Sequence, residues 1–352
     1  MRIAIVVPVA YVEGESWDEL AHRYIPMHHA RHLAALGHEV HLFADGPPRV
    51  FAHDGFTVHV LHAPFPAVGG VVRSPHLIRA ADAIHPDVIH LHHLLAAENV
   101  AAAVRTGRRV FAEYHGGEAP RWRWRRALAR WASARLAGAF FANPTIAERL
   151  RRDGALAPDT PVHISPETTS RYLKLEPHEA GGLRVLVVGR CEAPKDPDAT
   201  LATFRAILAR APDAQLVWAS ASGADTDRIR AAMSPAVNAS LTFGPVPVSK
   251  MPATFASADV TICTSAREIG GTVLSESLSQ GTPFAAFHLP TFEALAPRCE
   301  AVALLPSRDP EALAERALAL AAADVREEAR RHFEDVLSWA AIARARTAIY
   351  AR

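Results

Sequence analysis

The segment RVLVVGRCEAPKDPDATLATFRAILAR, residues 184–210, decides the prediction of the fold. It begins with an apolar, β-branched run, Arg184–Val188, which is typical of a buried strand. Gly189 follows, where the backbone can turn sharply, and Asp198–Arg210 then has the pattern of a helix. A strand, a glycine turn and a helix together form one unit of a parallel α/β sheet.

Strands and helices alternate on both sides of this segment. Before it, we predict a helix over His28–Leu36 and strands over Ile3–Val7, Glu39–Phe43, Thr57–Leu61, Val88–Leu91, Arg109–Glu113 and Ala139–Ala142. After it, we predict strands over Gln215–Ser220, Leu241–Phe243, Val260–Thr264 and Phe284–Phe287, helices over Asp227–Met233, Lys250–Ala256 and Val273–Gln280, and a helical end from about Pro310. Continuous apolar strands separated by helices indicate doubly wound parallel sheets that are covered on both faces.

The length of 352 residues suits two domains better than one. The stretch from Pro166 to Gly182 is rich in proline, glycine and polar residues, so we place the junction there, with a first domain over 1–170. Ligands of doubly wound sheets bind at the carboxyl ends of the strands. Two such domains that face each other would enclose a cleft, and the residues that follow the strands are the ones to inspect.

The composition excludes several classes of protein. Lys plus Arg number 38 and Asp plus Glu 37, and this balance gives no support to a nucleic-acid binder. Three widely spaced cysteines predict neither a disulfide framework nor a zinc site, and they favour a cytoplasmic location. The sequence has no apolar run long enough for a transmembrane helix, and its short apolar beginning is typical of a buried strand rather than a signal peptide.

A cationic turn follows the strand at 184–188. Arg190 and Lys195 lie in one short loop that leads into a helix. Two cations beside the backbone amides of a helix start can clamp a diphosphate. The alternative is a pair of solvated surface charges, and this motif alone leaves both interpretations open.

A second constellation follows the predicted strand at 260–264. Gly270 and Gly271 can bring bare backbone amides close to a phosphate, and a helix from about Thr272 would direct its positive end to the same place. The Glu276 carboxylate can accept both hydroxyls of a ribose, and that of Glu268 can accept hydroxyls of a sugar. The alternative for Glu276 is a capping or surface carboxylate.

Together the two motifs resemble those of the retaining glycosyltransferases of family 4, the glycogen-synthase-like enzymes with the GT-B architecture. The resemblance rests on Gly189-Arg190 with Lys195 five positions later, on Glu268 and Glu276 in a Glu-x7-Glu motif, and on the turn at 281–283. Supporting stretches are LGHEV (36–40), PDVIH (86–90), ASADV (256–260) and Ser338-Trp339. The resemblance implies two Rossmann-like domains, with the acceptor side in 1–170, the donor side in 171–335, and a helix over 336–352 that crosses back to the first domain.

The resemblance also implies roles for residues. Arg190 and Lys195 would neutralise the diphosphate beside Gly189, Glu276 would hold the ribose and Glu268 the donor sugar. Amides of Gly270, Gly271 and Thr272 would complete the pocket, and the base would lie against the loop 244–247, which contains Val246. No metal or other cofactor is implied, because the nucleotide-sugar is a substrate, and UDP is its expected nucleotide.

His115 in the first domain matches a histidine that lies near the donor sugar in members of the family, and it follows the predicted strand at 109–113. The alternative is a histidine that only forms a hydrogen bond with a loop. We favour a role in the site because of the match and the glycine pair that follows.

The sequence departs from the family pattern in three places. The stretch with Glu13, Gly14 and Glu15 replaces the Gly-Gly loop after the first strand, and we expect it, with His92, on the acceptor side. Residues 269–271 lack the usual aromatic, and residues 165–169 lack the usual Asn-Gly turn. These departures suggest a divergent member with an unusual acceptor, such as a secondary metabolite or a glycoconjugate.

Three weaker signals have ordinary explanations. Asp225-Thr226-Asp227 has the form of a metal-binding motif, but N-capping of the next helix explains it better. His90, His92 and His93 lack a carboxylate or thiol at ligand spacing, so we expect them to line the cleft. The segment Arg121–Arg126 is rich in Arg and Trp and can touch an anionic membrane surface, although we favour a solvated helix whose tryptophans pack inward.

Two rival functions remain. A nucleotide-sugar epimerase can have the same architecture and bind the same donors without an acceptor site. A non-catalytic homologue would bind the donor without reacting, although the intact Arg190, Lys195, Glu268 and Glu276 argue against it. Motifs of serine hydrolases, P-loop NTPases and dinucleotide-binding dehydrogenases do not occur.

Overall fold

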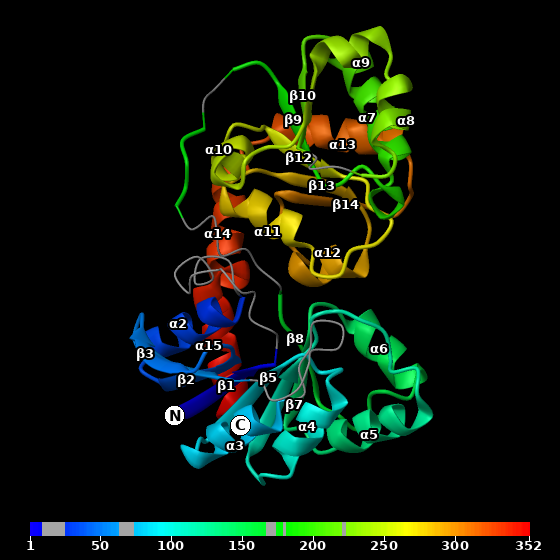
Figure 1. Ribbon diagram of the computed structural model, residues 1–352. Coiled ribbons are helices and arrows are strands. Elements are labelled where there is room, and N and C mark those ends of the chain that lie inside the picture. Colours follow the sequence, from blue (N-terminus) through cyan, green and yellow to red (C-terminus); the bar gives the residue numbers. More distant parts are fainter. Residues whose placement is uncertain (9–24, 63–73, 167–173, 179–180, 220–222) are drawn as a thin grey trace. The chain divides into compact units, whose positions relative to one another are not determined.

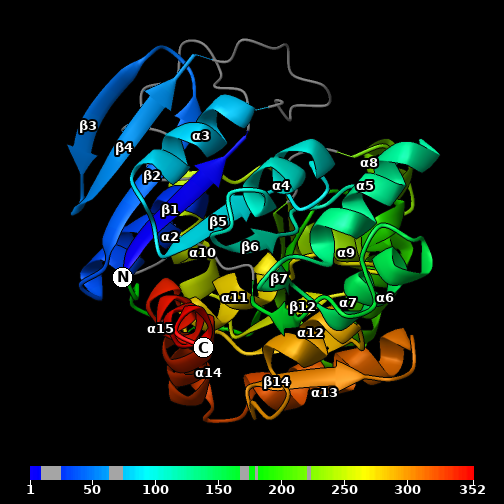
Figure 2. The same cartoon turned by 90° about the horizontal axis from the view of Figure 1, so that it is seen from below.

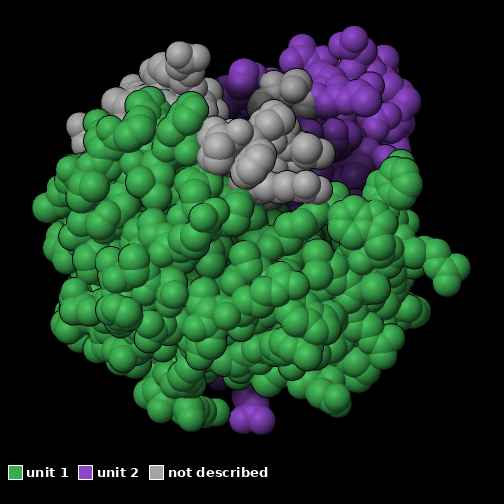
Figure 3. Space-filling view, turned by 60° about the horizontal axis from the view of Figure 1, so that its bottom comes forward, with its two compact units in different colours: residues 1–166, 339–352 green, residues 167–338 purple. Residues whose placement is uncertain are grey.

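The computed structural model describes residues 1–8, 25–62, 74–166, 174–178, 181–219 and 223–352. The chain forms two compact units, which Figure 3 distinguishes by colour. Unit 1 comprises Met1–Pro166 and Trp339–Arg352, and unit 2 comprises Glu167–Ser338. The chain therefore passes between the units at 166/167 and 338/339, where the sequence predicted 170/171 and 335/336.

Unit 1 contains an eight-stranded sheet in the order β3-β4-β2-β1-β5-β6-β7-β8 (Figure 1). All neighbouring strands run parallel except β3, which pairs antiparallel with β4. The strands are β1 (Arg2–Val7), β2 (Glu39–Asp45), β3 (Arg49–His53), β4 (Phe56–Leu61), β5 (Val88–His92), β6 (Arg109–Glu113), β7 (Gly138–Phe141) and β8 (Val162–Ile164).

Helices cover both faces of this sheet, as Figure 2 shows. One face packs against α3 (Pro75–Ala83), α4 (Ala97–Val104), α5 (Arg123–Ser133) and α6 (Pro144–Arg152). The other face packs against α2 (Ile25–Ala35) and α15 (Trp339–Tyr350). In β1, Ala4 and Val6 contribute to the first core while Ile3 and Ile5 contribute to the second, because successive side chains of a strand point to opposite faces.

Unit 2 contains a six-stranded sheet in the order β11-β10-β9-β12-β13-β14, with every pair parallel. The strands are β9 (Arg184–Val188), β10 (Gln215–Ala219), β11 (Leu241–Gly244), β12 (Val260–Cys263), β13 (Phe284–Phe287) and β14 (Val302–Leu305). One face carries α7 (Pro197–Arg210), α8 (Thr226–Ala231), α9 (Pro235–Ser240) and α13 (Pro310–Ala321). The other carries α10 (Met251–Ala256), α11 (Thr272–Ser279), α12 (Pro290–Leu295), α14 (Arg326–His332) and a π-helical turn (Phe333–Leu337).

The prediction of two doubly wound α/β domains is confirmed, but three strands were missed. Strand β3 is an edge strand with mostly exposed side chains, so it has no apolar run to announce it. The turn Asp54-Gly55 that joins it to β4 has positive φ at both residues and is the signal that was overlooked. β8 is only three residues long, and β14 follows α12 closely.

Among the described residues, no helix is long and apolar enough to cross a bilayer.

Helix α15 is tied to unit 1 by a buried ion pair. Arg346 is 1% exposed, and its guanidinium donates to both oxygens of Glu113, with Nη2 at 2.6 Å from Oε1 and Nη1 at 3.0 Å from Oε2. Ala343 and Tyr350 of the same helix are fully buried in the second core. Because burying either charge alone would be costly, the position of α15 and the ionised state of Glu113 depend on each other.

We expect Arg346→Met to leave Glu113 as an unpaired buried charge and to lower the free energy of unfolding by about 3–5 kcal/mol. Arg346→Met combined with Glu113→Gln should recover part of that loss, because the buried charge is gone. Arg344 lies on the same helix and is exposed, so Arg344→Met is the matched control. Urea unfolding measures all three, and a loss in Arg346→Met no larger than in Arg344→Met would contradict the expectation.

Candidate functional site

The candidate donor site lies where the strand order of unit 2 reverses. β9 lies between β10 and β12. The chain continues from β9 to β10 and β11 on one side of β9, and β12, β13 and β14 are added on the other side. In doubly wound sheets, this reversal opens a ligand-binding crevice at the carboxyl ends of the two central strands. The cationic turn follows β9, and the segment that leads to Glu268 follows β12.

The two predicted motifs meet at this edge of the sheet. Nζ of Lys195 lies 2.5 Å from Oε1 of Glu268, although 73 positions separate them in the sequence. Ser265 Oγ donates to the same carboxylate oxygen at 2.7 Å. Backbone and side-chain bonds also join the loops, since Ala266 N–H donates to the Pro194 carbonyl and Thr264 Oγ1 to the Lys195 carbonyl. The structure thus brings Lys195 of the cationic turn and Glu268 of the second motif into direct contact within unit 2.

Arg308 joins the same two loops, and the sequence analysis missed it. Its guanidinium donates to Asp196 Oδ2 at 2.5 Å, to the Thr264 carbonyl at 2.7 Å and to the Ser265 carbonyl at 3.0 Å. Arg308 follows β14, so the same strand-end rule that selected Arg190 and Glu268 would have found it if β14 had been predicted. Arg308 therefore joins the Asp196 side chain of the first loop to the backbone of the loop that follows β12.

Helix α11 begins beside this carboxylate. Gly271 is its N-cap residue with φ +64°, and a Cβ there would lie 2.8 Å from Leu295 Cδ1, so both backbone conformation and packing require glycine. Gly270 is buried, Thr272 is exposed at the first helical position, and Glu276 is half-buried one turn further. The first amides of a helix carry partial positive charge, which favours an anion there.

The other residues that the resemblance assigns to the donor site, Arg190, Gly189 and Val246, also follow strands of this sheet. The side chain of Arg190 is 65% exposed and pairs with Glu192 at 2.8 Å. Such an exposed pair contributes less than about 1 kcal/mol, so the guanidinium can exchange this partner for a ligand. Gly189 closes β9, and its carbonyl accepts a bond from Trp218 Nε1 at 3.3 Å. Val246 follows β11 and packs half-buried against the core of unit 2.

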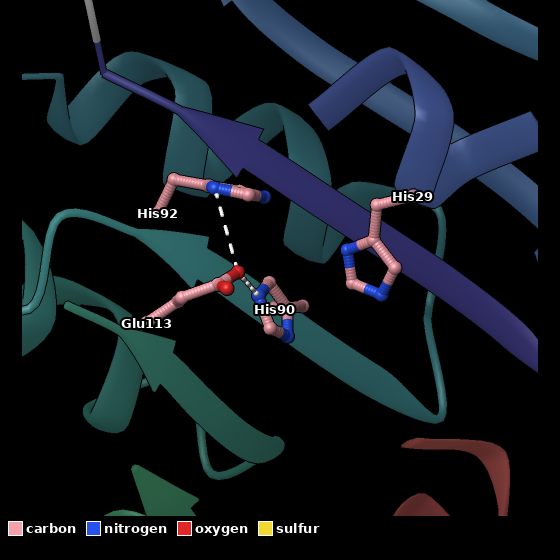
Figure 4. Close-up of side chains that lie close together, drawn as sticks. All are labelled: His29, His90, His92 and Glu113. Carbon is pink, nitrogen blue, oxygen red and sulfur yellow. Dashed lines mark hydrogen bonds and ion pairs between the residues drawn. The ribbon is translucent and has the colours of Figure 1, made fainter. Parts of the chain in front are cut away.

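In unit 1, the predicted residue His115 belongs to a buried cluster of histidines around Glu113. Figure 4 shows His29, His90 and His92 around this carboxylate. His90 Nε2 lies at hydrogen-bond distance from Glu113 Oε2, 3.1 Å, and His92 Nδ1 lies 3.7 Å from the same oxygen. His115 Nε2 lies 2.6 Å from His92 Nδ1 and 3.8 Å from Glu113 Oε2. The structure thus brings together His92 and His115, which were predicted separately, and adds Glu113, which the sequence analysis missed.

Hydrogen-bond chemistry assigns the protons of His90. Its Nε2 lies 3.1 Å from Glu113 Oε2, and a carboxylate only accepts, so Nε2 carries the proton. Its Nδ1 then accepts from the Tyr350 hydroxyl at 2.7 Å, and burial raises the pKa of Tyr350, which keeps that hydroxyl protonated. Burial lowers the pKa of His90 to about 4, so the ring is neutral at physiological pH.

The charge on Glu113 is fixed by its neighbours. Burial alone would raise the pKa of the Glu113 carboxyl, but the Arg346 guanidinium and the hydrogen bond from His90 hold it well below its usual range. Burial lowers the pKa of His92 and His115, while the negative Glu113 opposes this shift. The cluster therefore holds one ion pair and several neutral imidazoles.

The four groups His29, His90, His92 and Glu113 lie close enough to one another for metal binding to be considered. The sequence has no carboxylate at ligand spacing from these histidines, but the neighbouring strand β6 supplies Glu113. Both oxygens of Glu113 already accept from Arg346, however, and a divalent ion would add a second buried cation beside that guanidinium. The donor set therefore suits an ion pair better than a metal.

Other predictions from the sequence need correction or lie outside the described residues. Asp225 occupies the N-cap position of α8 without a side-chain capping bond, and its carboxylate accepts from Arg228 Nε at 3.1 Å instead. Trp122 and Trp124 were expected to pack inward, but they are 68% and 55% exposed, because the small residues of α5 face the core. Glu13, Gly14 and Glu15 lie outside the described residues.

Comparisons with known proteins agree with this arrangement of strands and motifs. Residues 27–166 match the family model described as Glycosyltransferase Family 4, and residues 182–323 match the model described as Glycosyl transferases group 1. The sequence search found no match among curated proteins.

Solved structures of glycosyltransferases share the fold over their whole length. A sucrose-phosphate synthase from Thermosynechococcus elongatus has a TM-score of 0.65 at 20% identity, with 99% of this chain and 98% of that chain covered. AviGT4, a glycosyltransferase involved in avilamycin A biosynthesis, has a TM-score of 0.63 at 20% identity, with coverage of 100% and 97%. Trehalose-6-phosphate synthase from E. coli, bound with UDP-2-fluoro glucose, has a TM-score of 0.62 at 10% identity, with coverage of 99% of each chain.

The two parallel-sheet units and the two matched family models thus define a glycosyltransferase of the GT-B fold. Between them, the two family models match most of both units. The chain belongs to the family-4-like glycosyltransferases, as the resemblance of its motifs implied.

We expect the stability of unit 1 to fall on acidification. Burial lowers the pKa of His29, His90 and His92, so these rings stay neutral in the folded chain while the unfolded chain protonates them below pH 6.5. The stabilisation is therefore complete above pH 6.5 and is lost progressively toward pH 4, the pKa of His90. His90 alone should contribute roughly 2 kcal/mol of the loss by about pH 5.

Urea unfolding at about pH 7.5 and about pH 5 measures this loss. His90→Gln keeps a side-chain N–H donor without a titrating ring and should reduce the difference between the two pH values. His288→Gln replaces an exposed histidine and is the matched control. A pH dependence that is the same in His90→Gln and the wild type would exclude His90 as its source.

Proposed function

We propose that the protein is a retaining, metal-independent hexosyltransferase that moves a sugar from a nucleoside-diphosphate sugar, with UDP as the nucleotide, to a small-molecule or glycoconjugate acceptor. The observation that carries the proposal is the contact between Lys195 Nζ and Glu268 Oε1 at the reversal of the strand order. This contact supports the proposal because the cation that would bind the diphosphate and the carboxylate that would bind the sugar are neighbours. They lie at the edge of the sheet where doubly wound folds bind nucleotides.

The diphosphate would bind between the cationic turn and α11. Lys195 is half-buried beside Glu268, and Arg190 is exposed on the same turn. Lys195 would therefore contact the diphosphate from the protein side and Arg190 from the solvent side. The amides at Gly271 and Thr272 would add partial positive charge at the start of α11. This charge stabilises the leaving diphosphate in the transition state, where negative charge develops on it.

The two carboxylates would hold the sugar parts of the donor. Lys195 and Ser265 both donate to Oε1 of Glu268, so Oε2 is the oxygen that would accept hydroxyls of the transferred sugar. Glu276 lies one helical turn beyond the amides of α11 and is half-buried, which suits a carboxylate that accepts both ribose hydroxyls. The loop with Val246 would contact the base.

The resemblance implies that His115 lies near the donor sugar, and that His92 belongs to the acceptor side together with Glu13, Gly14 and Glu15. His115 follows β6 just as Glu268 follows β12. The His92 ring contacts His115 and lies beside Glu113, which is paired with Arg346. The acceptor would attack from the face that the diphosphate vacates, which retains the configuration. The similar trehalose-6-phosphate synthase bound with UDP-2-fluoro glucose supports UDP as the donor nucleotide.

Removal of either motif should abolish transfer. After a thermal-shift screen of nucleoside diphosphates and their sugars has identified the donor, Lys195→Ala and Glu276→Gln should each lower its turnover at least about 100-fold, because each removes a charged contact to the donor. Lys174→Ala, at an exposed lysine in the same unit, is the matched control.

Product analysis separates the rival functions. Nucleoside diphosphate released only with an acceptor indicates transfer, whereas an isomerised sugar-nucleotide without acceptor would indicate an epimerase. Binding of the donor with no product would indicate a non-catalytic homologue. Unchanged turnover in both Lys195→Ala and Glu276→Gln would refute the proposed site.

Transfer should also survive the removal of divalent metal. The cations Arg190 and Lys195 would perform the charge neutralisation that Mg²⁺ supplies in metal-dependent enzymes. Turnover measured with EDTA should therefore stay within about twofold of turnover with added Mg²⁺. A loss in EDTA that Mg²⁺ or Mn²⁺ restores would show that the site needs a metal.

A further inference from the structure

We propose that α5 and the turn before it bind the surface of an anionic phospholipid bilayer. The residues concerned, called here the Arg/Trp face, are the exposed side chains Arg121, Trp122, Arg123, Trp124, Arg130 and Arg135. The proposed transfer reaction gives this surface no role, so the inference is independent of that reaction.

The sequence around α5 contains basic residues and no acidic ones. Between Glu118 and Glu148 the chain has six arginines and neither aspartate nor glutamate. The whole protein has a net charge of only +1, so this charge is local. A local cationic segment attracts an anionic surface, with about 1 kcal/mol for each Arg close to it.

The fold leaves the two tryptophans in solvent. Ala129, Ala132 and Ser133 form the buried side of α5, and Trp131 packs half-buried against the same core, whereas Trp122 and Trp124 lie outside it. Trp122 and Trp124, 68% and 55% exposed, are among the most exposed large apolar side chains of the described residues. Exposed tryptophan beside arginine is the composition of helices that lie in the interfacial region of a bilayer.

Not every arginine of the segment belongs to the face. Arg125 pairs with Glu98 at 2.9 Å, and Arg126 donates to the Pro120 carbonyl and lines a cavity of about 290 Å³ with Glu118, Arg149 and Asp153. Arg121, Arg123 and Arg130 have no carboxylate within ion-pair distance among the described residues. Arg135 is exposed and lies over the half-buried ring of Trp131. Four cations and two indoles therefore remain for a ligand.

Charge complementarity selects an anionic bilayer as that ligand. Arginine forks bind lipid phosphates, while the indoles enter the boundary between headgroups and acyl chains. A nucleic acid would use the same cations, but proteins that bind it usually carry a basic excess over the whole domain, which this chain lacks. The bilayer is therefore the better match, and nucleic acid is an outcome that the test must detect.

The test is co-sedimentation of the full chain with vesicles of phosphatidylcholine, with and without phosphatidylglycerol. The wild type should sediment with the anionic vesicles only, and less so at high salt because salt screens the attraction. Trp122→Ala with Trp124→Ala, and separately Arg123→Glu with Arg130→Glu, should each weaken the binding at least about tenfold.

Matched controls lie on other exposed surfaces. Arg316→Glu with Arg344→Glu makes the same change of net charge, and Val50→Ala with Leu175→Ala removes two exposed apolar side chains. Both controls should bind like the wild type. The proposal would be overturned if the wild type did not sediment with anionic vesicles, or if both α5 variants bound them as tightly as the wild type does. Tighter binding of a single-stranded oligonucleotide than of the vesicles would also overturn it.

Discussion

The directions of the strands in the two sheets determine where chemistry can occur in this protein. In a parallel sheet every strand ends at the same edge. The loop after β9 leads toward β10 on one side, and the loop after β12 leads toward β13 on the other side. The loops after β9, β12 and β14 therefore meet, and Lys195, Glu268 and Arg308 come together from distant parts of the sequence. The same constraint in unit 1 places His92 and His115 after neighbouring strands β5 and β6.

The sequence predicted much of this arrangement because strand ends can be read from apolar runs and glycine turns. Arg184–Val188 and Phe284–Phe287 were predicted with the bounds that the structure has. β3 was missed because its side chains are mostly exposed, and Arg308 was missed with its strand β14. Local patterns report burial and periodicity, so they identify central strands well and exposed edge strands poorly.

The cluster around Glu113 could not be predicted, because its members share no local pattern. His29 comes from α2, His90 and His92 from β5, Glu113 from β6, and Arg346 from the last helix, 233 positions after Glu113. The error over Trp122 and Trp124 has a related cause. An amphipathic pattern shows that a helix has two faces, but it does not show which tryptophans the fold buries: Trp131 packs half-buried against the core, whereas Trp122 and Trp124 are exposed.

The buried ion pair has a cost that a hydrophobic contact would avoid, since well-packed apolar residues often stabilise a fold more than a buried pair of the same volume. What the pair provides is a fixed negative charge beside neutral imidazoles. Glu113 accepts from His90 Nε2, which determines the tautomer of that ring, and it lies within 3.8 Å of both nitrogens that join His92 to His115. A methionine and a leucine in place of Arg346 and Glu113 could still anchor α15, but they could not orient a proton in this cluster. The ion pair thus keeps Glu113 ionised as the acceptor for His90 Nε2, which an apolar pair of the same volume would not do.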